Sequence, residues 1–256
     1  MKLDGNTILI TGGSSGIGFE FARAFVALRN TVIITGRDVA KLAKAQAQVP
    51  ELKTIRSDVS LVEDINALYV KVSDDFPPLN VLMNNAGVMR PINFHKDGDD
   101  LDDLTSEIDI NLKGYVRMTR RFLPHLKNQA AAAIINITSA LAFVPLPLVP
   151  VYCATKAGLH SFTQSLRVQL SRTKVQVFEV APPATQTDML GTFESADLKG
   201  FSTMPVTDMV QASLRGLKRG TPEIRPGQSK LLWLMNRVAP NFILAQLAKP
   251  AQRMQH

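Results

Sequence analysis

Short runs of apolar and β-branched residues recur along this chain, and most are apolar at consecutive positions rather than at alternate ones. Strands with apolar side chains on both faces are typical of a parallel sheet that helices cover on each side. We therefore predict buried strands at 7–11, 31–35, 53–57, 80–84, 133–138 and 175–181.

The segments between these runs repeat their apolar residues at helical spacing. One stripe consists of Ile17, Phe21, Ala24, Phe25 and Leu28, and another of Leu159, Phe162, Leu166 and Leu170. A longer helical pattern reaches about Lys127 and follows the aspartates at 97, 99, 100, 102 and 103, whose charge suits a helix start. The alternation predicts an α/β, Rossmann-type fold: a doubly wound, mostly parallel sheet in three layers, forming a single domain over residues 1–256.

Composition limits the class of protein. The single cysteine, Cys153, allows no internal disulfide, and the four histidines show no metal-ligand spacing, so we predict no metal site. Neither a signal peptide nor an apolar run of about 20 residues occurs, so we expect a cytoplasmic protein. Residues 199–256 hold nine of the 29 basic side chains and two of the 22 acidic ones. A solvated basic surface is the favoured interpretation; an anionic substrate or membrane is the alternative, and with no accompanying motif we predict no nucleic acid partner.

A glycine-rich turn follows the first predicted strand and directly precedes a helical pattern. Gly12 permits a tight turn, Gly16 lets the backbone approach a pyrophosphate, and Gly18 allows close packing of helix and strand. The free N–H groups and the dipole of a helix start favour a phosphate. We therefore predict that this turn binds a dinucleotide, with contacts from Gly12, Ser14, Ser15, Gly16, Ile17 and Gly18.

The end of the second predicted strand indicates which dinucleotide is bound. A site for NAD(H) usually has Asp or Glu here, which holds the ribose 2′-hydroxyl. This chain has Gly36 followed by Arg37. Glycine leaves room, and the paired N–H donors of arginine suit a 2′-phosphate, so we predict NADP(H) in preference to NAD(H).

Tyr152 and Lys156 lie four residues apart at the start of a strong helical pattern, which places them on one helix face. A free tyrosine, with a pKa near 10, is a poor base at neutral pH. A nearby ammonium would stabilise the phenolate and lower the pKa of Tyr152, so that the phenol can exchange a proton with a substrate. Cys153 beside it is interpreted as a small packed residue rather than a nucleophile.

Together these motifs resemble the short-chain dehydrogenase/reductase family. The pattern T-G-x3-G-x-G matches the glycine turn, N-N-A-G matches residues 84–87, and Y-x3-K matches Tyr152 and Lys156. Asn111, Ser139, Tyr152 and Lys156 occur in the order of the family's catalytic tetrad, and the resemblance covers about residues 5–190. It implies an NAD(P)-dependent oxidoreductase acting on CH–OH or C=O groups, and a homo-dimer or homo-tetramer.

The resemblance also implies a role for each tetrad residue. Tyr152 would donate a proton to the carbonyl oxygen as hydride arrives, and Ser139 would hydrogen-bond the same oxygen. Lys156 would bind the nicotinamide ribose and tune Tyr152, and Asn111 would position a water in a relay to Lys156. For Ser139 and Asn111 the structural alternative is turn capping and helix hydrogen bonding.

The remaining cofactor contacts come from three loops. Asp58, with Val59 beside it, matches the adenine contact of the family, and Asn85, Ala86 and Gly87 belong to N-N-A-G. After the sixth strand the family pattern P-G-x3-T appears with Pro183 in place of glycine, and Pro182, Thr185 and Thr187 are the expected contacts. The Pro-Pro form resembles a bacterial subgroup named after an oxidoreductase of the teichoic-acid D-alanylation operon, a name that indicates no substrate.

Two further segments complete the prediction. Residues 190–205, with Leu190, Phe193, Leu198 and Phe201, are expected to cover a small, partly apolar carbonyl or alcohol substrate. The tail 230–256 is amphipathic and interrupted at Pro240. We favour a role for it in covering the pocket or in a subunit interface, and rank contact with a membrane below these.

Other functions on the same fold stay open. One is a dinucleotide sensor without catalysis, and another is a membrane-peripheral protein that uses the basic tail. A dehydratase or epimerase of nucleotide sugars usually has a longer chain with a separate substrate domain, which 256 residues hardly accommodate.

Overall fold

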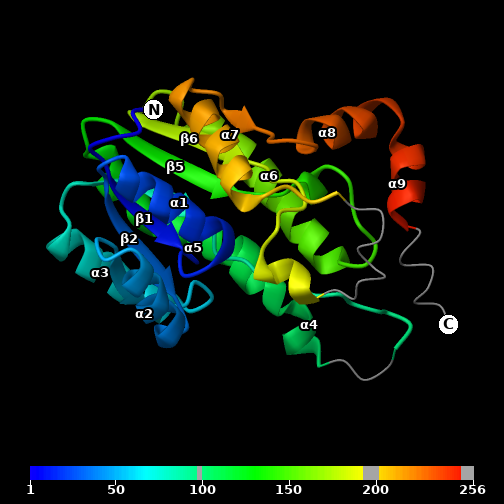
Figure 1. Ribbon diagram of the computed structural model, residues 1–256, viewed down its shortest axis with the longest axis horizontal. Coiled ribbons are helices and arrows are strands. Elements are labelled where there is room, and N and C mark those ends of the chain that lie inside the picture. The colour runs from blue at the N-terminus through cyan, green and yellow to red at the C-terminus, as the bar shows by residue number, and fades with distance from the viewer. Residues whose placement is uncertain (97–99, 193–201, 249–256) are drawn as a thin grey trace.

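Seven strands form one parallel sheet in this computed structural model, which describes residues 1–96, 100–192 and 202–248 (Figure 1). The strands lie in the order β3-β2-β1-β4-β5-β6-β7, and every neighbouring pair is parallel. Their bounds are β1 Thr7–Thr11, β2 Thr31–Gly36, β3 Lys53–Arg56, β4 Leu79–Asn84, β5 Ala132–Ile137, β6 Val175–Val180 and β7 Glu223–Ile224.

Helices connect the strands and cover both faces of the sheet. The α-helices are α1 Gly16–Ala27, α2 Val39–Gln48, α3 Val62–Asp75, α4 Leu101–Ile108, α5 Gly114–Lys127, α6 Pro150–Gln169, α7 Val206–Lys218, α8 Ser229–Val238 and α9 Pro240–Ala248. A π-turn, Asp109–Lys113, joins α4 to α5, and two 3₁₀ turns lie at Ala140–Ala142 and Asp188–Thr192.

Two hydrophobic cores lie on opposite faces of the sheet, and the alternation of strand side chains produces them. In β1, Ile8 and Ile10 pack with α1, α2 and α7, whereas Leu9 between them packs with α3, α5 and α6. The structure therefore has three layers, helices on sheet on helices. The predicted Rossmann-type fold, with its doubly wound parallel sheet, is confirmed.

The predicted strands all form, with bounds that agree within one residue. The expected burial is wrong for β3, whose residues are partly or fully exposed because the strand lies at the edge of the sheet. The long helical pattern before Lys127 also forms, but the π-turn divides it. Asp100 caps α4 by accepting the N–H of Asp102 at 2.9 Å, and Asp102 and Asp103 occupy the first turn, as expected from helix electrostatics. The aspartates at 97 and 99 lie outside the described residues. The short strand β7 was not predicted, because two residues show no periodicity.

The topology defines where a ligand can bind. The chain winds outward from β1 through β2 to β3, and then returns to β4 on the other side of β1. In such sheets the crevice lies outside the carboxyl ends of the strands, at the point where the order reverses. Among the described helices, none has the length and apolarity to cross a membrane.

Candidate active site

A cavity of about 900 Å³ opens along the carboxyl ends of the strands. Nearly all the predicted site residues line it: Gly12, Ser14, Ser15, Gly16, Ile17, Arg37, Asp58, Val59, Asn85, Ala86, Gly87, Ser139, Tyr152, Lys156, Pro182, Thr185 and Thr187. Two predicted residues, Gly18 and Asn111, lie behind its wall. The fold therefore collects residues from the ends of six strands, β1 to β6, and from α6 into one space.

The glycine turn forms one wall of the cavity, where its backbone lies close to the loop after β4 and to the first turn of α1. Gly12 has a φ of +63° and Gly16 a φ of +55°, which favour glycine. A Cβ at Gly12 would lie 2.7 Å from the Cα of Ala86, and one at Gly18 would lie 2.4 Å from the Gly12 carbonyl oxygen. Gly18 thus serves the close packing that the sequence predicted for it, without facing the cavity.

Thr11 joins the glycine turn to the loop after β4. Its hydroxyl accepts the backbone N–H groups of Asn85 at 3.0 Å and Ala86 at 3.1 Å. The Asn85 side chain in turn donates to the carbonyl oxygens of Thr11 and Gly12, both at 3.0 Å. The two loops that were predicted to hold a dinucleotide therefore form one hydrogen-bonded unit.

The start of α1 has the properties of an anion site. Its N-cap residue Ser15 makes no capping side-chain bond, and the first turn contains no acidic residue. Ser15, Gly16 and Ile17 line the cavity there. Unpaired backbone N–H groups at a helix start, together with the helix dipole, favour a phosphate.

The far end of the cavity is more polar and carries two cations. Arg37 and Lys41 line this end, and Lys41 was not predicted from the sequence. Arg37 Nε lies 3.9 Å from the Asp58 carboxylate. Asp38 lines it too, but its side chain caps α2 by accepting the Lys41 N–H at 3.1 Å. Thr35 and Ser57 also line this end, and the hydroxyl oxygen of each is buried without a hydrogen-bond partner in the described chain.

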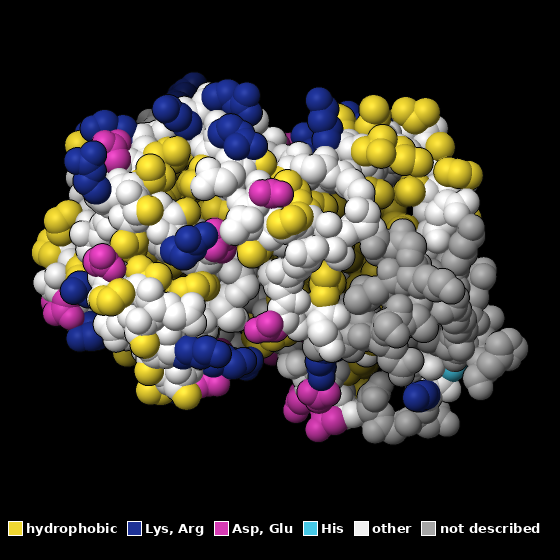
Figure 2. Space-filling model, in the orientation of Figure 1, with side chains coloured by type: hydrophobic (Ala, Val, Ile, Leu, Met, Phe, Trp, Pro, Cys, Tyr) yellow, Lys and Arg dark blue, Asp and Glu magenta, His cyan; other side chains and the backbone are white. Residues whose placement is uncertain are grey.

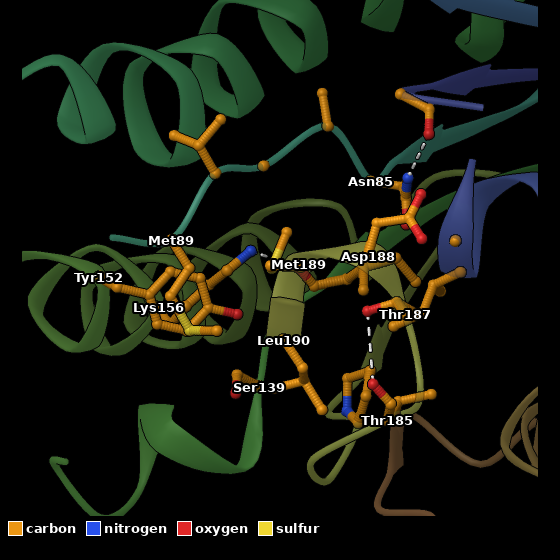
Figure 3. A pocket seen from close by; sticks show the side chains of 18 of the residues that line it. Asn85, Met89, Ser139, Tyr152, Lys156, Thr185, Thr187, Asp188, Met189 and Leu190 are labelled. Atoms are coloured by element: carbon orange, nitrogen blue, oxygen red, sulfur yellow. Dashed lines mark hydrogen bonds between the residues drawn. The ribbon is translucent and has the colours of Figure 1, made fainter. Parts of the chain in front are cut away.

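Tyr152, Lys156 and Ser139 meet at the other end. Tyr152 and Lys156 belong to the first turns of α6, one turn apart, and Ser139 begins the segment after β5. Figure 3 shows these side chains with Met89, Met189 and Leu190 around them. Lys156 Nζ donates to the Ile137 carbonyl oxygen at 3.0 Å and lies 5.5 Å from the centre of the Tyr152 ring.

Burial dominates the electrostatics of this end, and here the structure differs from the expectation. Tyr152 is 7% exposed, and burial raises its pKa above the ordinary value, while a hydrogen bond with Ser139 acts in the opposite sense. Burial lowers the pKa of Lys156 to about 7, opposed by the charge of Glu107. The expected lowering of the Tyr152 pKa by Lys156 is not found: burial has the largest effect on this pKa, and the one group that lowers it is Ser139.

Cys153 fits its interpretation as a packed residue. Its thiol is buried, and its Sγ accepts the backbone N–H of Leu146 at 3.2 Å. Burial raises the pKa of this thiol to about 11, which leaves little thiolate at neutral pH. The described residues also contain no group of three or more His, Cys, Asp or Glu side chains that could hold a metal ion.

Asn111 lies in the π-turn and is fully buried. Its side chain accepts the Val88 N–H at 2.9 Å and donates to the Val88 carbonyl oxygen at 2.8 Å. It also donates to the Thr155 hydroxyl at 3.3 Å, on the α6 turn between Tyr152 and Lys156. The structure therefore shows Asn111 fastening the loop after β4 to α6; its predicted water relay stays a prediction.

Apolar side chains surround the end of the cavity that contains Tyr152 and Lys156. They come from four separate segments: Met89, Leu141, Leu146, Leu148, Met189, Leu190, Leu232 and Leu247. Leu190 was predicted; Phe193, Leu198 and Phe201 lie outside the described residues. Most of the others follow strands or belong to loops without periodicity, so no local pattern in the sequence marks them.

The tail forms two helices that break where Pro240 begins α9, as predicted. Gln228 just before α8, Leu232 of α8, and Gln246 and Leu247 of α9 line the cavity. Trp233 lies between two guanidinium groups, Arg225 at 4.3 Å and Arg237 at 4.4 Å from the ring centre. The tail therefore covers part of the cavity.

The same helices also present apolar side chains to solvent. The exposed ones are Leu231, Leu234, Val238, Phe242 and Leu244, and they contribute to the hydrophobic surface at the α8–α9 end of the molecule (Figure 2). Leu231, Leu234 and Val238 follow the spacing of one helix face.

Comparison with known proteins agrees with this geometry. A model of the short chain dehydrogenase family matches residues 6–197. The uncharacterized oxidoreductase DltE of Bacillus subtilis is 45% identical over 226 residues, which cover 88% of this chain and 89% of its own. The 11-beta-hydroxysteroid dehydrogenase-like 3 of Arabidopsis thaliana is 32% identical and covers 92% of this chain and 78% of its own.

Solved structures show the same fold with bound dinucleotides. A short chain dehydrogenase from Burkholderia cenocepacia in complex with NADP has a TM-score of 0.81 at 25% identity, covering 96% of this chain and 99% of its own. One from Sphingobium yanoikuyae in complex with NADPH has a TM-score of 0.80 at 25% identity, covering 94% and 95%. Since the family model spans most of the chain and DltE shares nearly half of the aligned residues, this protein belongs to the short chain dehydrogenase family and is an NAD(P)-dependent oxidoreductase.

Proposed function

We propose that this protein transfers a hydride between NADP(H) and a small, partly apolar carbonyl or alcohol, with Tyr152 as general acid and base. The observation that carries the proposal is the meeting of Tyr152, Ser139 and Lys156 in the same cavity as the glycine turn. The polar end suits an adenosine and its phosphates, and the apolar end suits a nicotinamide and a substrate. We further propose that the protein acts in the cytoplasm.

The residues present fit the dinucleotide. The N–H groups at the start of α1 would hold the pyrophosphate, in a cradle where side chains at Gly12 and Gly16 are disfavoured. The unpartnered hydroxyls of Thr35 and Ser57 would find acceptors or donors at the adenosine end. When bound, the nicotinamide supplies or accepts the hydride.

The chain's own contribution to the reaction is control of one proton. In reduction the Tyr152 hydroxyl donates its proton to the carbonyl oxygen, and in oxidation the phenolate takes it back. Ser139 hydrogen-bonds the same oxygen and fixes its position. Lys156 binds ribose hydroxyls and, as an ammonium, stabilises the phenolate that donation leaves. Asn111 fixes the position of Val88 relative to α6 through its hydrogen bonds. It would also position a water that relays the proton to Lys156.

Preference for NADP(H) rests on the charge at the polar end. Gly36 leaves no carboxylate for a ribose 2′-hydroxyl, and Arg37 and Lys41 supply two cations for a 2′-phosphate. Asp38 is engaged in capping α2. The structural relatives bound to NADP and NADPH at 25% identity are consistent with this preference.

The exposed apolar face of α8 and α9 supports association with another surface. We propose that it packs against a second copy of this chain in a homo-dimer or homo-tetramer. An anionic membrane surface is the second candidate, because residues 229–248 contain Lys230 and Arg237 but no acidic residue.

Arg37→Ala tests the choice of cofactor. The variant loses a charged donor to the 2′-phosphate, so we expect kcat/KM for NADPH to fall about tenfold and that for NADH to change less than about twofold. Arg56→Ala is the control, since Arg56 is an exposed arginine at the end of β3 that pairs with Asp64 instead. A wild-type enzyme that prefers NADH would contradict the proposal.

Tyr152→Phe tests the acid and base. With the hydroxyl gone, we expect kcat to fall by about 10²-fold or more, while NADPH fluorescence titration gives a Kd close to that of the wild type. Tyr69→Phe on α3 is the matched control and should retain its activity. Rates near those of the wild type in Tyr152→Phe would remove the residue from its role, and NADPH binding without turnover of any carbonyl by the wild type would favour a sensor.

Leu234→Lys tests the surface on the tail. We expect sedimentation velocity to show a dimer or tetramer for the wild type and a shift towards monomer for the variant, because a buried unpaired charge opposes association. Val70→Lys, at an exposed valine of α3, should leave assembly unchanged. A monomeric wild type that co-sediments with anionic vesicles would instead support the membrane candidate.

A further inference from the structure

A buried carboxylate and an imidazole lie beside the carboxyl end of β5. Glu179 of β6 is 1% exposed, and its Oε2 lies 2.8 Å from Nδ1 of His160 on α6. Its Oε1 lies 3.0 Å from the same nitrogen and accepts the Thr138 hydroxyl at 2.7 Å. Burying a carboxylate is costly unless hydrogen bonds compensate, and here each of its oxygens has a partner.

His160 is the basic partner of this carboxylate. Among the described residues it is the only basic side chain that forms an ion pair with Glu179. Glu223 lies opposite Glu179 in the register of β6 and β7. Its carboxylate has other partners, which are Arg167 at 3.2 Å and Arg225. Because a carboxylate only accepts hydrogen bonds, Nδ1 of His160 carries the proton that joins the pair.

Thr138 is the link between this pair and Ser139. The ladder between β5 and β6 ends at Ile137, opposite Val180, so Ser139 lies two residues beyond the strand. Thr138 donates its backbone N–H to the Val180 carbonyl oxygen at 2.8 Å, and its hydroxyl bonds Glu179. Ser139 keeps an extended backbone, with φ −167° and ψ 158°, so its side chain points away from the side to which Thr138 points.

The same pair contacts the other end of the segment that contains Ser139. The chain turns at Ala140–Ala142 and then brings Phe143 against His160. The two rings meet edge to face, with their centres 5.0 Å apart and their planes at 84°. The segment is thus fastened by Glu179 at its start and by His160 at its end.

We propose that Glu179 and His160 form a positioning pair for Ser139: they hold residues 138–143 so that the Ser139 hydroxyl meets the substrate oxygen. Neither of them is among the described residues that line the cavity, so they act through Thr138 and Phe143. The inference rests on the proposed function, because its catalytic effect depends on the hydrogen bond that Ser139 is proposed to make.

Thr138→Val tests the link with little change in shape. The variant loses the hydroxyl that bonds Glu179, so we expect kcat to fall by about tenfold through misplacement of Ser139. The Kd for NADPH, from fluorescence titration, should stay close to that of the wild type. Thr138→Ser keeps a hydroxyl and should restore most of the activity. Thr7→Val, at a buried threonine at the amino end of β1, is the control and should leave kcat unchanged.

A double-mutant cycle with Ser139→Ala shows whether Thr138 acts through Ser139. Single-turnover rates are used, so that slow variants stay measurable. Once the Ser139 hydroxyl is absent, Thr138→Val should lower the rate by less than about twofold, since both substitutions disable the same contact. Equal factors with and without that hydroxyl would mean that Thr138 serves the fold in another way, and would overturn the proposal.

Two substitutions of Glu179 test the acceptor itself. Glu179→Gln keeps an oxygen for the Thr138 hydroxyl, and its amide can donate to Nδ1 of His160 in the other tautomer, so kcat should fall less than about threefold. Glu179→Leu has a similar size and neither bond, and should lower kcat as far as Thr138→Val does. Thermal unfolding verifies that each variant is folded at the assay temperature.

The pair can also be tested without catalysis. NMR of ¹⁵N-labelled histidine shows which ring nitrogen carries a proton, and His160→Gln assigns the resonances. The wild type at neutral pH should show a protonated Nδ1 in His160, because the Glu179 carboxylate only accepts. An unprotonated Nδ1 would contradict the pair.

The outcomes separate this inference from the proposed function. If Ser139→Ala kept full activity while Nδ1 of His160 was protonated, the role proposed for Ser139 would fail and the contacts of the pair would stand. If Ser139→Ala lost activity but Thr138→Val matched the wild type, only the positioning role of Glu179 and His160 would be overturned.

Discussion

A lysine ammonium enclosed by protein is the constraint on which this active site depends. Lys156 is 3% exposed, and a charge at such a position loses its hydration. Three kinds of interaction compensate for part of this loss: a hydrogen bond to the Ile137 carbonyl, the faces of two tyrosine rings, and the charge of Glu107. Burial therefore lowers the pKa of Lys156 to about 7, so a modest change in its surroundings alters its protonation near neutral pH.

The parallel sheet explains how these groups come together. Each strand directs its carboxyl end to the same edge, so a glycine turn, two cations and a tyrosine–lysine pair that lie far apart in the sequence line one cavity. Thr11 and Asn111 then fasten the loop after β4, one to the glycine turn and the other to α6. The residues proposed to bind the cofactor and those proposed to transfer the proton are thus parts of one hydrogen-bonded framework.

Local patterns predicted the features that depend on local physics. Consecutive apolar residues located the strands, and Pro240 located the break between the tail helices, because a proline readily begins a helix. The sign of the Tyr152 pKa shift could not be predicted, since it depends on burial by segments such as the loop at Met89 and the tail. Lys41 and Glu179 were missed because each looks like an ordinary charged residue of a helix or a strand; only the packing shows which charges face the cavity or the core. The roles given to the tetrad remain proposals.

The most direct test of the central claim is a crystal structure of the protein with NADP⁺ bound. The account predicts the pyrophosphate at the N–H groups of Gly16 and Ile17, and the nicotinamide ribose within hydrogen-bond distance of Lys156 Nζ, beside the Tyr152 hydroxyl. A dinucleotide bound elsewhere, or a Lys156 that stays turned away from the ribose, would contradict it.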